Sequence, residues 1–183
     1  MSVVRRSRSR RCPSMSTPVE ALGQGELRQL VTFRLGDEEY AVDVGQVQEI
    51  VRLTSITAVP RSASYVEGVV NLRGRIVPVI DLAGRFGLAR RPRSKASRIV
   101  ITEVGGRTVG MLVDAVSEVL RLEASAIDPT PEMLQAGIQA DFITGIGKLE
   151  GRLLIMLDLP RVLCGQDETE LALATAGGED AGQ

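Results

Sequence analysis

The sequence predicts a mainly β fold in which two similar small barrels pack against each other. Hydrophobic residues make up 44% of the 183 residues, but aromatic residues only 3% and Trp is absent. The core must therefore be built mainly from Val, Ile and Leu, and the β-branched types among them favour sheet. An internal repeat within residues 27–164 predicts two similar units, and two strands that are apolar at nearly every position predict that these units cover each other.

The repeat consists of two blocks that recur in the same order. Residues 44–53 match residues 113–122, with identical residues at the positions of Val44, Val47, Glu49, Arg52 and Leu53. Residues 66–82 match residues 143–159. The identical residues of this second block are at the positions of Gly68, Leu72, Gly74, Arg75, Asp81 and Leu82. Two copies in one order predict two similar subdomains.

The first copy begins with a predicted hairpin. Val31, Phe33 and Leu35 alternate with polar residues, which is typical of a half-buried strand. A turn is expected at residues 36–37, and residues 40–42 run back along the first strand.

A helix is predicted next, over residues 44–51. Asp43 is expected to cap its N-terminus, with Gln46 three residues later in the capping-box position. Residues 44, 47, 50 and 51 are apolar and would lie on one face of this helix.

A tight hairpin turn is predicted at residues 72–75, between strands 66–71 and 76–80. Gly74 supplies the positive φ that such a turn needs, and residues 149–152 repeat the design in the second copy. The following strands, 76–80 and 153–157, are apolar at nearly every position, as strands covered on both faces are. A barrel of about 60 residues cannot cover both faces alone, so the two barrels are expected to share a third core between them.

The predicted boundaries follow from these elements. The first barrel is predicted to span about 27–84 and the second about 98–164. An exchange of chain segments between the two barrels is compatible with these limits. The connecting segment, 85–97, is extremely basic: residues 85–98 hold six Arg or Lys and no acid. Residues 1–26, rich in Arg and Ser, and the acidic residues 165–183 are predicted to be flexible, and Met15 is an alternative start.

Composition excludes several functional classes. The chain has no His, which removes His-based triads, His metal ligands and a phosphoacceptor His. A net charge of −1 gives no general attraction to nucleic acid, and no apolar run approaches the roughly 20 residues that cross a bilayer. Cys12 and Cys164 lie in the predicted tails, so no disulfide, metal site or cofactor is expected, and a cytoplasmic protein is predicted.

No catalytic constellation is recognisable. The glycines at 105–106 lack the spacing of a phosphate-binding loop. Asp81 and Asp158 recur at equivalent places in the repeat, which favours caps or turn formers over an acid/base pair. The basic segment could bind phosphates, but Phe86 is its only aromatic, and a solvated hinge is favoured. A duplicated barrel without such chemistry is expected to work by contact with other proteins.

The run 68–82 (GVVNLRGRIVPVIDL), preceded by 47–50 (VQEI), closely resembles the signature of CheW-type coupling proteins, and the resemblance extends over about residues 30–163. It implies two SH3-like five-stranded barrels and a non-catalytic cytoplasmic adaptor, without cofactor or metal, at receptor arrays on the inner face of the membrane. The implied partners are a chemotaxis histidine kinase, through its homologous regulatory domain, and the cytoplasmic tips of chemoreceptors, in a groove between the barrels.

The resemblance also implies a partner-binding site. Glu49 and Arg73 match an ion pair near the receptor-facing surface, although ordinary surface charge is the alternative reading. Gly68, Asn71 and Gly74 are expected to hold the surface in shape. The full predicted set is Val47, Glu49, Gly68, Asn71, Leu72, Arg73 and Gly74.

Two other functions are left open by the sequence. The same scaffold could serve a twitching or developmental signalling pathway with another kinase. A small-molecule-binding or catalytic barrel is the remaining alternative, and it predicts stabilisation by a ligand.

Overall fold

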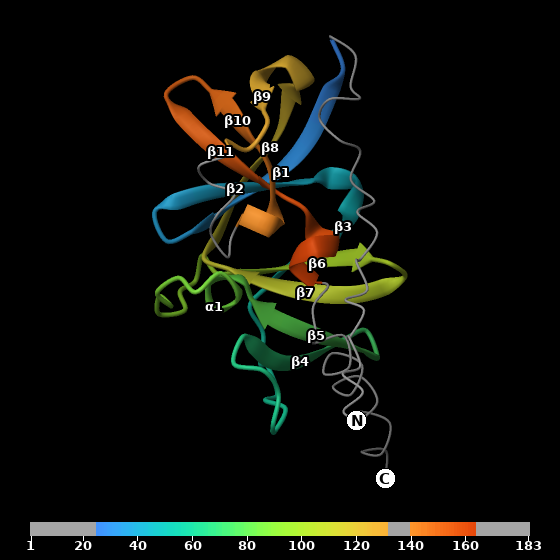
Figure 1. The fold of residues 1–183 in the computed structure, drawn as a ribbon. Coiled ribbons are helices and arrows are strands. Elements are labelled where there is room, and N and C mark those ends of the chain that lie inside the picture. Colours follow the sequence, from blue (N-terminus) through green and yellow to red (C-terminus); the bar gives the residue numbers. More distant parts are fainter. Residues whose placement is uncertain (1–24, 132–139, 164–183) are drawn as a thin grey trace, which may run out of the picture.

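The structure, a computed structural model, describes residues 25–131 and 140–163, and most of these residues lie in strands (Figure 1). Two sheets pack one above the other in this view. The predicted fold class, mainly β with two packed units and short helices, is confirmed. The predictions for residues 1–24 and 165–183, for Met15 and for both cysteines concern positions outside the described residues.

The first sheet has six strands in the order β8-β1-β2-β11-β10-β9. Neighbours run antiparallel, except that β11 and β2 are parallel. Its sixth member is a strand of only two residues, which the expected five strands did not include. The strands are β1 (Leu27–Leu35), β2 (Glu38–Asp43), β8 (Ala115–Glu123), β9 (Ile127–Asp128), β10 (Ile143–Leu149) and β11 (Arg152–Leu157).

The second sheet has five strands in the order β3-β6-β7-β5-β4, with β5 and β7 parallel. A backbone bridge between Thr57 and Val69 adds one further pairing at the outer edge of β4. The strands are β3 (Val47–Arg52), β4 (Val66–Leu72), β5 (Arg75–Asp81), β6 (Arg98–Val104) and β7 (Arg107–Val113).

Each copy of the repeat contributes strands to both sheets. The chain leaves the six-stranded sheet after β2, builds all of the five-stranded sheet, and returns to the six-stranded sheet at Asp114. The limits 27–84 and 98–164 therefore do not coincide with the two sheets. Residues 85–97 join β5 to β6 within the five-stranded sheet, and the chain passes between the two sheets at η2 and at Asp114.

The predicted helix over 44–51 is wrong. Asp43 does act as a cap, since its Oδ1 accepts a hydrogen bond from the Gly45 amide at 2.8 Å, but the turn that it caps is η2 (Val44–Gln46), a single 3-10 turn. Strand β3 follows directly, with a register shift between Val47 and Glu49. The remaining helical elements are equally short: α1 (Leu82–Arg85), η3 (Ala124–Ala126), η5 (Ala140–Phe142) and α2 (Leu159–Leu163).

Three hydrophobic clusters fill the described part of the molecule. One lies within the six-stranded sheet around Leu30, Leu122 and Leu154, and another within the five-stranded sheet around Val79 and Ile99. The largest cluster lies between them and draws on strands of both sheets. The expected third core is thus present, and all five aromatic residues of the chain are in it or packed against it.

The aromatic residues form a row across this central core. Phe33 stacks on Tyr40 at 6.1 Å between ring centroids, Tyr40 on Phe86 at 5.7 Å, and Phe86 contacts Phe142 at 5.7 Å. Phe33 and Tyr40 belong to the six-stranded sheet, whereas Phe86 follows α1 beside the five-stranded sheet. Offset contacts of this kind contribute about 0.5–1.5 kcal/mol beyond area burial, so they tie the two units together.

The doubly covered strands are confirmed in β5 and only partly in β11. Residues 77–81 of β5 are buried without interruption. In β11, Leu154 and Met156 are buried in the six-stranded sheet, but Leu153 is 61% exposed. The start of β11 therefore presents an apolar side chain at the surface.

Candidate partner-binding surface

The turn between β4 and β5 presents Arg73 at one end of the five-stranded sheet. Arg73 and Gly74 have φ values of +54° and +82°, the pair of positive angles that a two-residue type I′ hairpin turn requires. The side chain of Asn71 stabilises the turn, because its Oδ1 accepts a hydrogen bond from the Gly74 amide at 2.9 Å. Asn71 and Gly74 thus shape the turn, and Leu72 packs against the core of the same sheet.

Arg73 forms an ion pair with Glu49 on β3. The Nη2 of Arg73 lies 3.1 Å from Oε2 of Glu49, and the two side chains are 83% and 33% exposed. Glu49 lies on a strand, and the helix predicted for it is absent. Because β3 and β4 are the two outer strands of the sheet, this pair connects opposite edges. An exposed ion pair contributes about 0.2–1 kcal/mol to stability. Most of the Arg73 side chain and about a third of the Glu49 side chain are accessible to a partner.

Gly68 is buried and shapes the backbone. A Cβ on Gly68 would lie 2.1 Å from the Thr57 carbonyl oxygen, and its φ of +144° is one that other residues rarely adopt. The close approach lets Thr57 and Val69 exchange two backbone hydrogen bonds of 2.9 and 2.8 Å. Gly68 therefore allows the segment before β4 to close against that strand.

The structure brings five of the seven predicted residues together at one end of the sheet. These are Glu49 on β3 and the turn residues at 71–74. Val47 lies at the start of β3 and packs against the central core, and Gly68 is a buried residue of the outer strand β4. The set is therefore part exposed contact surface and part internal support.

Two further polar contacts flank this end of the sheet and were not anticipated. Arg75 donates from Nη2 to Thr108 Oγ1 at 3.2 Å, and Gln48 donates to the carboxylate of Glu103. Both link segments more than 30 residues apart in sequence. No local pattern could have found them, because the pairing of β3 with β6 and of β5 with β7 is visible only in the folded sheet.

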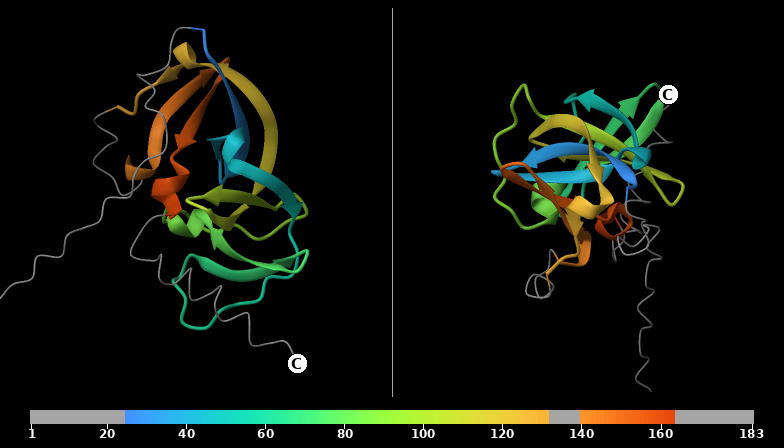
Figure 2. Two further views of the ribbon diagram at one scale, coloured as in Figure 1. Left: turned by 90° about the vertical axis from the view of Figure 1, so that its right-hand side faces the viewer. Right: turned by 90° about the horizontal axis from the view of Figure 1, so that it is seen from above.

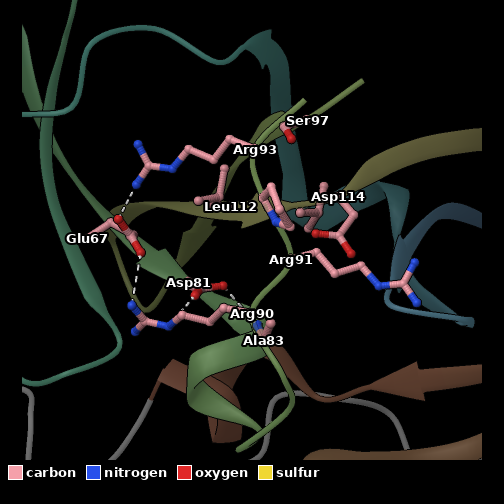
Figure 3. Close-up of a pocket in the computed structure, with 11 residues that line it drawn as sticks. Glu67, Asp81, Ala83, Arg90, Arg91, Arg93, Ser97, Leu112 and Asp114 are labelled. Carbon is pink, nitrogen blue, oxygen red and sulfur yellow. Dashed lines mark hydrogen bonds and ion pairs between the residues drawn. The ribbon is translucent and has the colours of Figure 1, made fainter. Parts of the chain in front are cut away.

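Residues 89–96 of the basic segment are exposed, as a solvated segment is, but three of its arginines form ion pairs with carboxylates that the sequence did not indicate. Figure 3 shows Arg90 between Asp81 and Glu67, with its Nε 3.0 Å from Asp81 Oδ2 and its Nη1 3.5 Å from Glu67 Oε1. Arg93 also pairs with Glu67. Arg91 turns away and reaches Asp37 of the other sheet's hairpin at 2.8 Å.

These groups line a cavity of about 340 Å³ beside the five-stranded sheet (Figure 3). Its walls carry both signs of charge, since Glu67, Asp81 and Asp114 face the arginines. The arginine charges are already matched by carboxylates, so a phosphate would have to displace them. The arrangement does not favour the phosphate-binding reading of this segment.

Asp81 and Asp158 are structural caps, as predicted. Oδ1 of Asp81 accepts from the Ala83 amide at 3.1 Å at the start of α1, and Oδ1 of Asp158 accepts from the Arg161 amide at 3.4 Å in α2. Burial raises the pKa of the Asp81 carboxyl, and Arg90 opposes this shift. Each carboxylate has its own arginine, Arg90 or Arg161, so the two do not form an acid/base pair.

Within residues 25–131 and 140–163, no group of three or more Cys, Asp or Glu is arranged to hold a metal ion. Among the helices of these same segments, none combines the length and apolar character that crossing a membrane demands.

The surface around Glu49 and Arg73 can make polar contacts with another macromolecule.

Comparison with known proteins points to one family. A family model for the CheW-like domain matches residues 29–166. A probable chemotaxis protein CheW from Rhizobium etli is 39% identical over 158 residues, covering 86% of this chain and 100% of that protein. Chemotaxis protein CheW from Klebsiella aerogenes is 34% identical over 153 residues, covering 84% of this chain and 92% of the relative.

A solved structure agrees with these relatives. The crystal structure of the scaffolding protein TtCheW from Thermoanaerobacter tengcongensis superposes with a TM-score of 0.68 at 40% sequence identity. The match covers 72% of this chain and 89% of that structure. Sequence and fold therefore identify the same set of relatives.

Proposed function

Because this chain belongs to the family of CheW-like domain proteins, we propose that it is a non-catalytic adaptor that couples chemoreceptors to a chemotaxis histidine kinase. The observation that carries the proposal is the family match over residues 29–166, joined by relatives named chemotaxis protein CheW and by a scaffolding protein of the same fold. The adaptor acts in the cytoplasm, where it is recruited to receptor arrays.

Two protein partners fit the two-unit architecture. The regulatory domain of the kinase docks on one unit, and the cytoplasmic tip of a receptor binds where the two units meet. Interfaces of ordinary size, about 1,200–2,000 Å² in total, suffice because many weak contacts gain strength when they are linked in one assembly. Signalling then requires that the adaptor binds active and inactive kinase arrangements with different affinities.

The contact residues that we assign are Glu49 and Arg73, together with Val47 and Leu72 beside them. Support comes from the exposure of the ion pair, 83% for the Arg73 side chain, at the end of a rigid two-residue turn. Gly68, Asn71 and Gly74 support the surface by fixing the backbone.

Replacing Arg73 by Asp tests the site. Aspartate tolerates the left-handed conformation of position 73 at least as well as arginine does, so the hairpin should persist while the charge at the surface is reversed. We expect binding of a receptor fragment or of the kinase regulatory domain, measured by titration calorimetry, to weaken at least about tenfold, the effect of placing like charges opposite each other at an interface.

Arg61→Asp is a matched control. Arg61 is also exposed and has a φ of +61°, but it lies in the segment between β3 and β4. This variant should bind both partners as the wild type does. Wild-type affinity in Arg73→Asp would refute the site, and a wild-type protein that binds neither partner would refute the adaptor function itself.

A further inference from the structure

Two arginines face each other across the pairing of β3 with β6. Arg52 is directly opposite Arg98 in the antiparallel register, and side chains in such positions lie on the same face of a sheet about 5 Å apart at Cβ. Arg52 is exposed and Arg98 is half-buried. Among the described residues, neither arginine forms an ion pair with a carboxylate.

A third cation lies at the same end of β6. Nη1 of Arg98 donates to the carbonyl oxygens of Lys95 and Ser97, at 2.7 and 2.9 Å, so its guanidinium is held against the turn that carries exposed Lys95. Arg52, Lys95 and Arg98 form what we call the cationic surface.

The nearby carboxylates are occupied elsewhere. Glu67, Asp81 and Asp37 pair with the three arginines at 90, 91 and 93. Asp114 follows Val113, the partner of Arg98 on β7, and its Oδ2 accepts from the Gly36 amide at 2.8 Å. Carboxylates thus pair with three arginines of the basic segment, whereas Lys95 and Arg98 form no ion pair within the described residues.

Like charges directly opposite each other destabilise a sheet. Within the described residues, Arg98 makes hydrogen bonds to backbone carbonyls, but no ion pair with a carboxylate offsets this repulsion. Unfavourable local arrangements, such as like charges placed opposite each other, are found in natural proteins mainly at functional sites. The opposed arginines therefore mark a surface that is completed by an anionic partner.

An exposed apolar residue adjoins these cations. Ile50 is 39% exposed and lies on the same face as Arg52, two residues along β3. Its partner across the ladder, Val100, is fully buried in the central core that both sheets share. The face with Ile50 and Arg52 is therefore the margin of the junction between the two units, and β3 and β8 lie on the same side of the molecule in the left view of Figure 2.

We propose that the cationic surface binds acidic side chains of the chemoreceptor tip, with an apolar receptor residue packed on Ile50. This inference rests on the proposed function, which puts the receptor where the two units meet. A carboxylate between Arg52 and Arg98 replaces their repulsion by two attractions, so the charge pattern also selects among receptors. A tip without an acidic residue at this position is bound weakly.

The test uses Arg52→Glu, Arg98→Glu and the double variant in the full chain. Binding is measured against the cytoplasmic signalling fragment of a chemoreceptor and against the kinase regulatory domain, both from the same organism. We expect each single variant to lose about fivefold and the double variant about twentyfold in receptor affinity, while kinase affinity stays within twofold. The wild-type receptor affinity should also fall more steeply with salt than that of the double variant.

Receptor binding is expected to fall in Arg52→Glu without a loss of stability. The introduced carboxylate can pair with Arg98, so its melting temperature should equal or exceed that of the wild type, although it binds the receptor less well. Arg61→Glu carries the same change in charge at an exposed position outside the cationic surface and should bind as the wild type does.

Three results overturn the inference. In the first, the wild type binds the receptor fragment and the double variant binds it equally well, which leaves the adaptor function intact. In the second, kinase affinity falls in place of receptor affinity. In the third, vesicles rich in phosphatidylglycerol bind the wild type but not the double variant, which would assign the surface to lipid. A wild type that binds neither protein contradicts the adaptor function and this inference together.

Discussion

Replacing Gly68 by alanine tests whether this residue acts through the backbone or through contact with a partner. The added Cβ would lie 2.1 Å from the carbonyl oxygen of Thr57 and 2.7 Å from its carbonyl carbon, both backbone atoms that cannot rotate away. The φ of +144° adds conformational strain for any residue with a side chain. Relief requires the segment before β4 to move off the strand.

The magnitude follows from these two costs. Backbone conformations that only glycine adopts readily cost about 1–3 kcal/mol for another residue, and overpacking adds about 1–3 kcal/mol. The lower entropy of the unfolded alanine chain returns about 0.4–1 kcal/mol. We therefore expect Gly68→Ala to lower the free energy of unfolding by about 3 kcal/mol, a large part of the 5–15 kcal/mol typical of a domain.

Gly74→Ala is the matched control. Its φ is +82°, but nothing lies within 4 Å of the added Cβ. Only the strain of the positive φ remains there, reduced by the unfolded-state gain, so a loss of about 1 kcal/mol is expected. Urea unfolding followed by far-ultraviolet circular dichroism measures both variants, since the chain has no Trp. Equal destabilisation by the two substitutions would refute the steric argument.

Two further predictions concern the junction and a buried carboxyl. Arg85 lies over the rings of Tyr65 at 4.8 Å and Phe142 at 5.0 Å, and its Nε donates to the Val162 carbonyl at 3.2 Å. In urea unfolding, Arg85→Gln should lower the free energy of unfolding by about 1–2 kcal/mol, and Arg85→Lys should lower it by less. Equal losses in the two variants would contradict the cation–π role. Burial raises the pKa of folded Asp81, so the stabilising effect of its protonated form is present at low pH and is lost as pH rises through the folded pKa. Asp81→Asn keeps a capping oxygen and should therefore be most stable relative to the wild type at neutral pH, with this advantage shrinking as pH falls toward 4; an advantage that grows on acidification would reverse the sign of the shift.

Local signals in the sequence predicted local structure well. The two-residue turn at 73–74 needs positive φ, and the Gly after an Asn-Leu-Arg run met that need in the structure. Asp43 and Asp81 cap the turns that follow them, as their positions indicated. Such features depend on neighbours within four residues, which a sequence displays directly.

The wrong helix at 44–51 has a physical explanation. Apolar residues at 44, 47, 50 and 51 fit a helical face, but the register shift between Val47 and Glu49 gives a strand the same spacing. The cap at Asp43 marks where a turn starts and carries no information on its length. Pairing with β6 decides for strand, and β6 is about 50 residues away.

The contacts of the basic segment were hidden for a similar reason. Arg93 meets Glu67 over a separation of 26 residues, and Arg91 meets Asp37 over 54. A run of arginines without an acid nearby in sequence is typical of a solvated segment. The partners become neighbours only through the packing of β4 and β5 and through the hairpin of the other sheet.

The exchange of strands between the sheets bears on how an adaptor of this kind can act. The chain passes from one sheet to the other at η2 and at Asp114, and a single core joins the faces of both sheets. Arg85 and Arg91 add contacts across the same junction. Rotation of one unit against the other would open a core that contains the stacked aromatic residues, at a cost far above thermal energy. We therefore expect the two units to move as one body, and in the proposed adaptor a displacement imposed at the receptor surface would be passed to the kinase surface as rigid geometry.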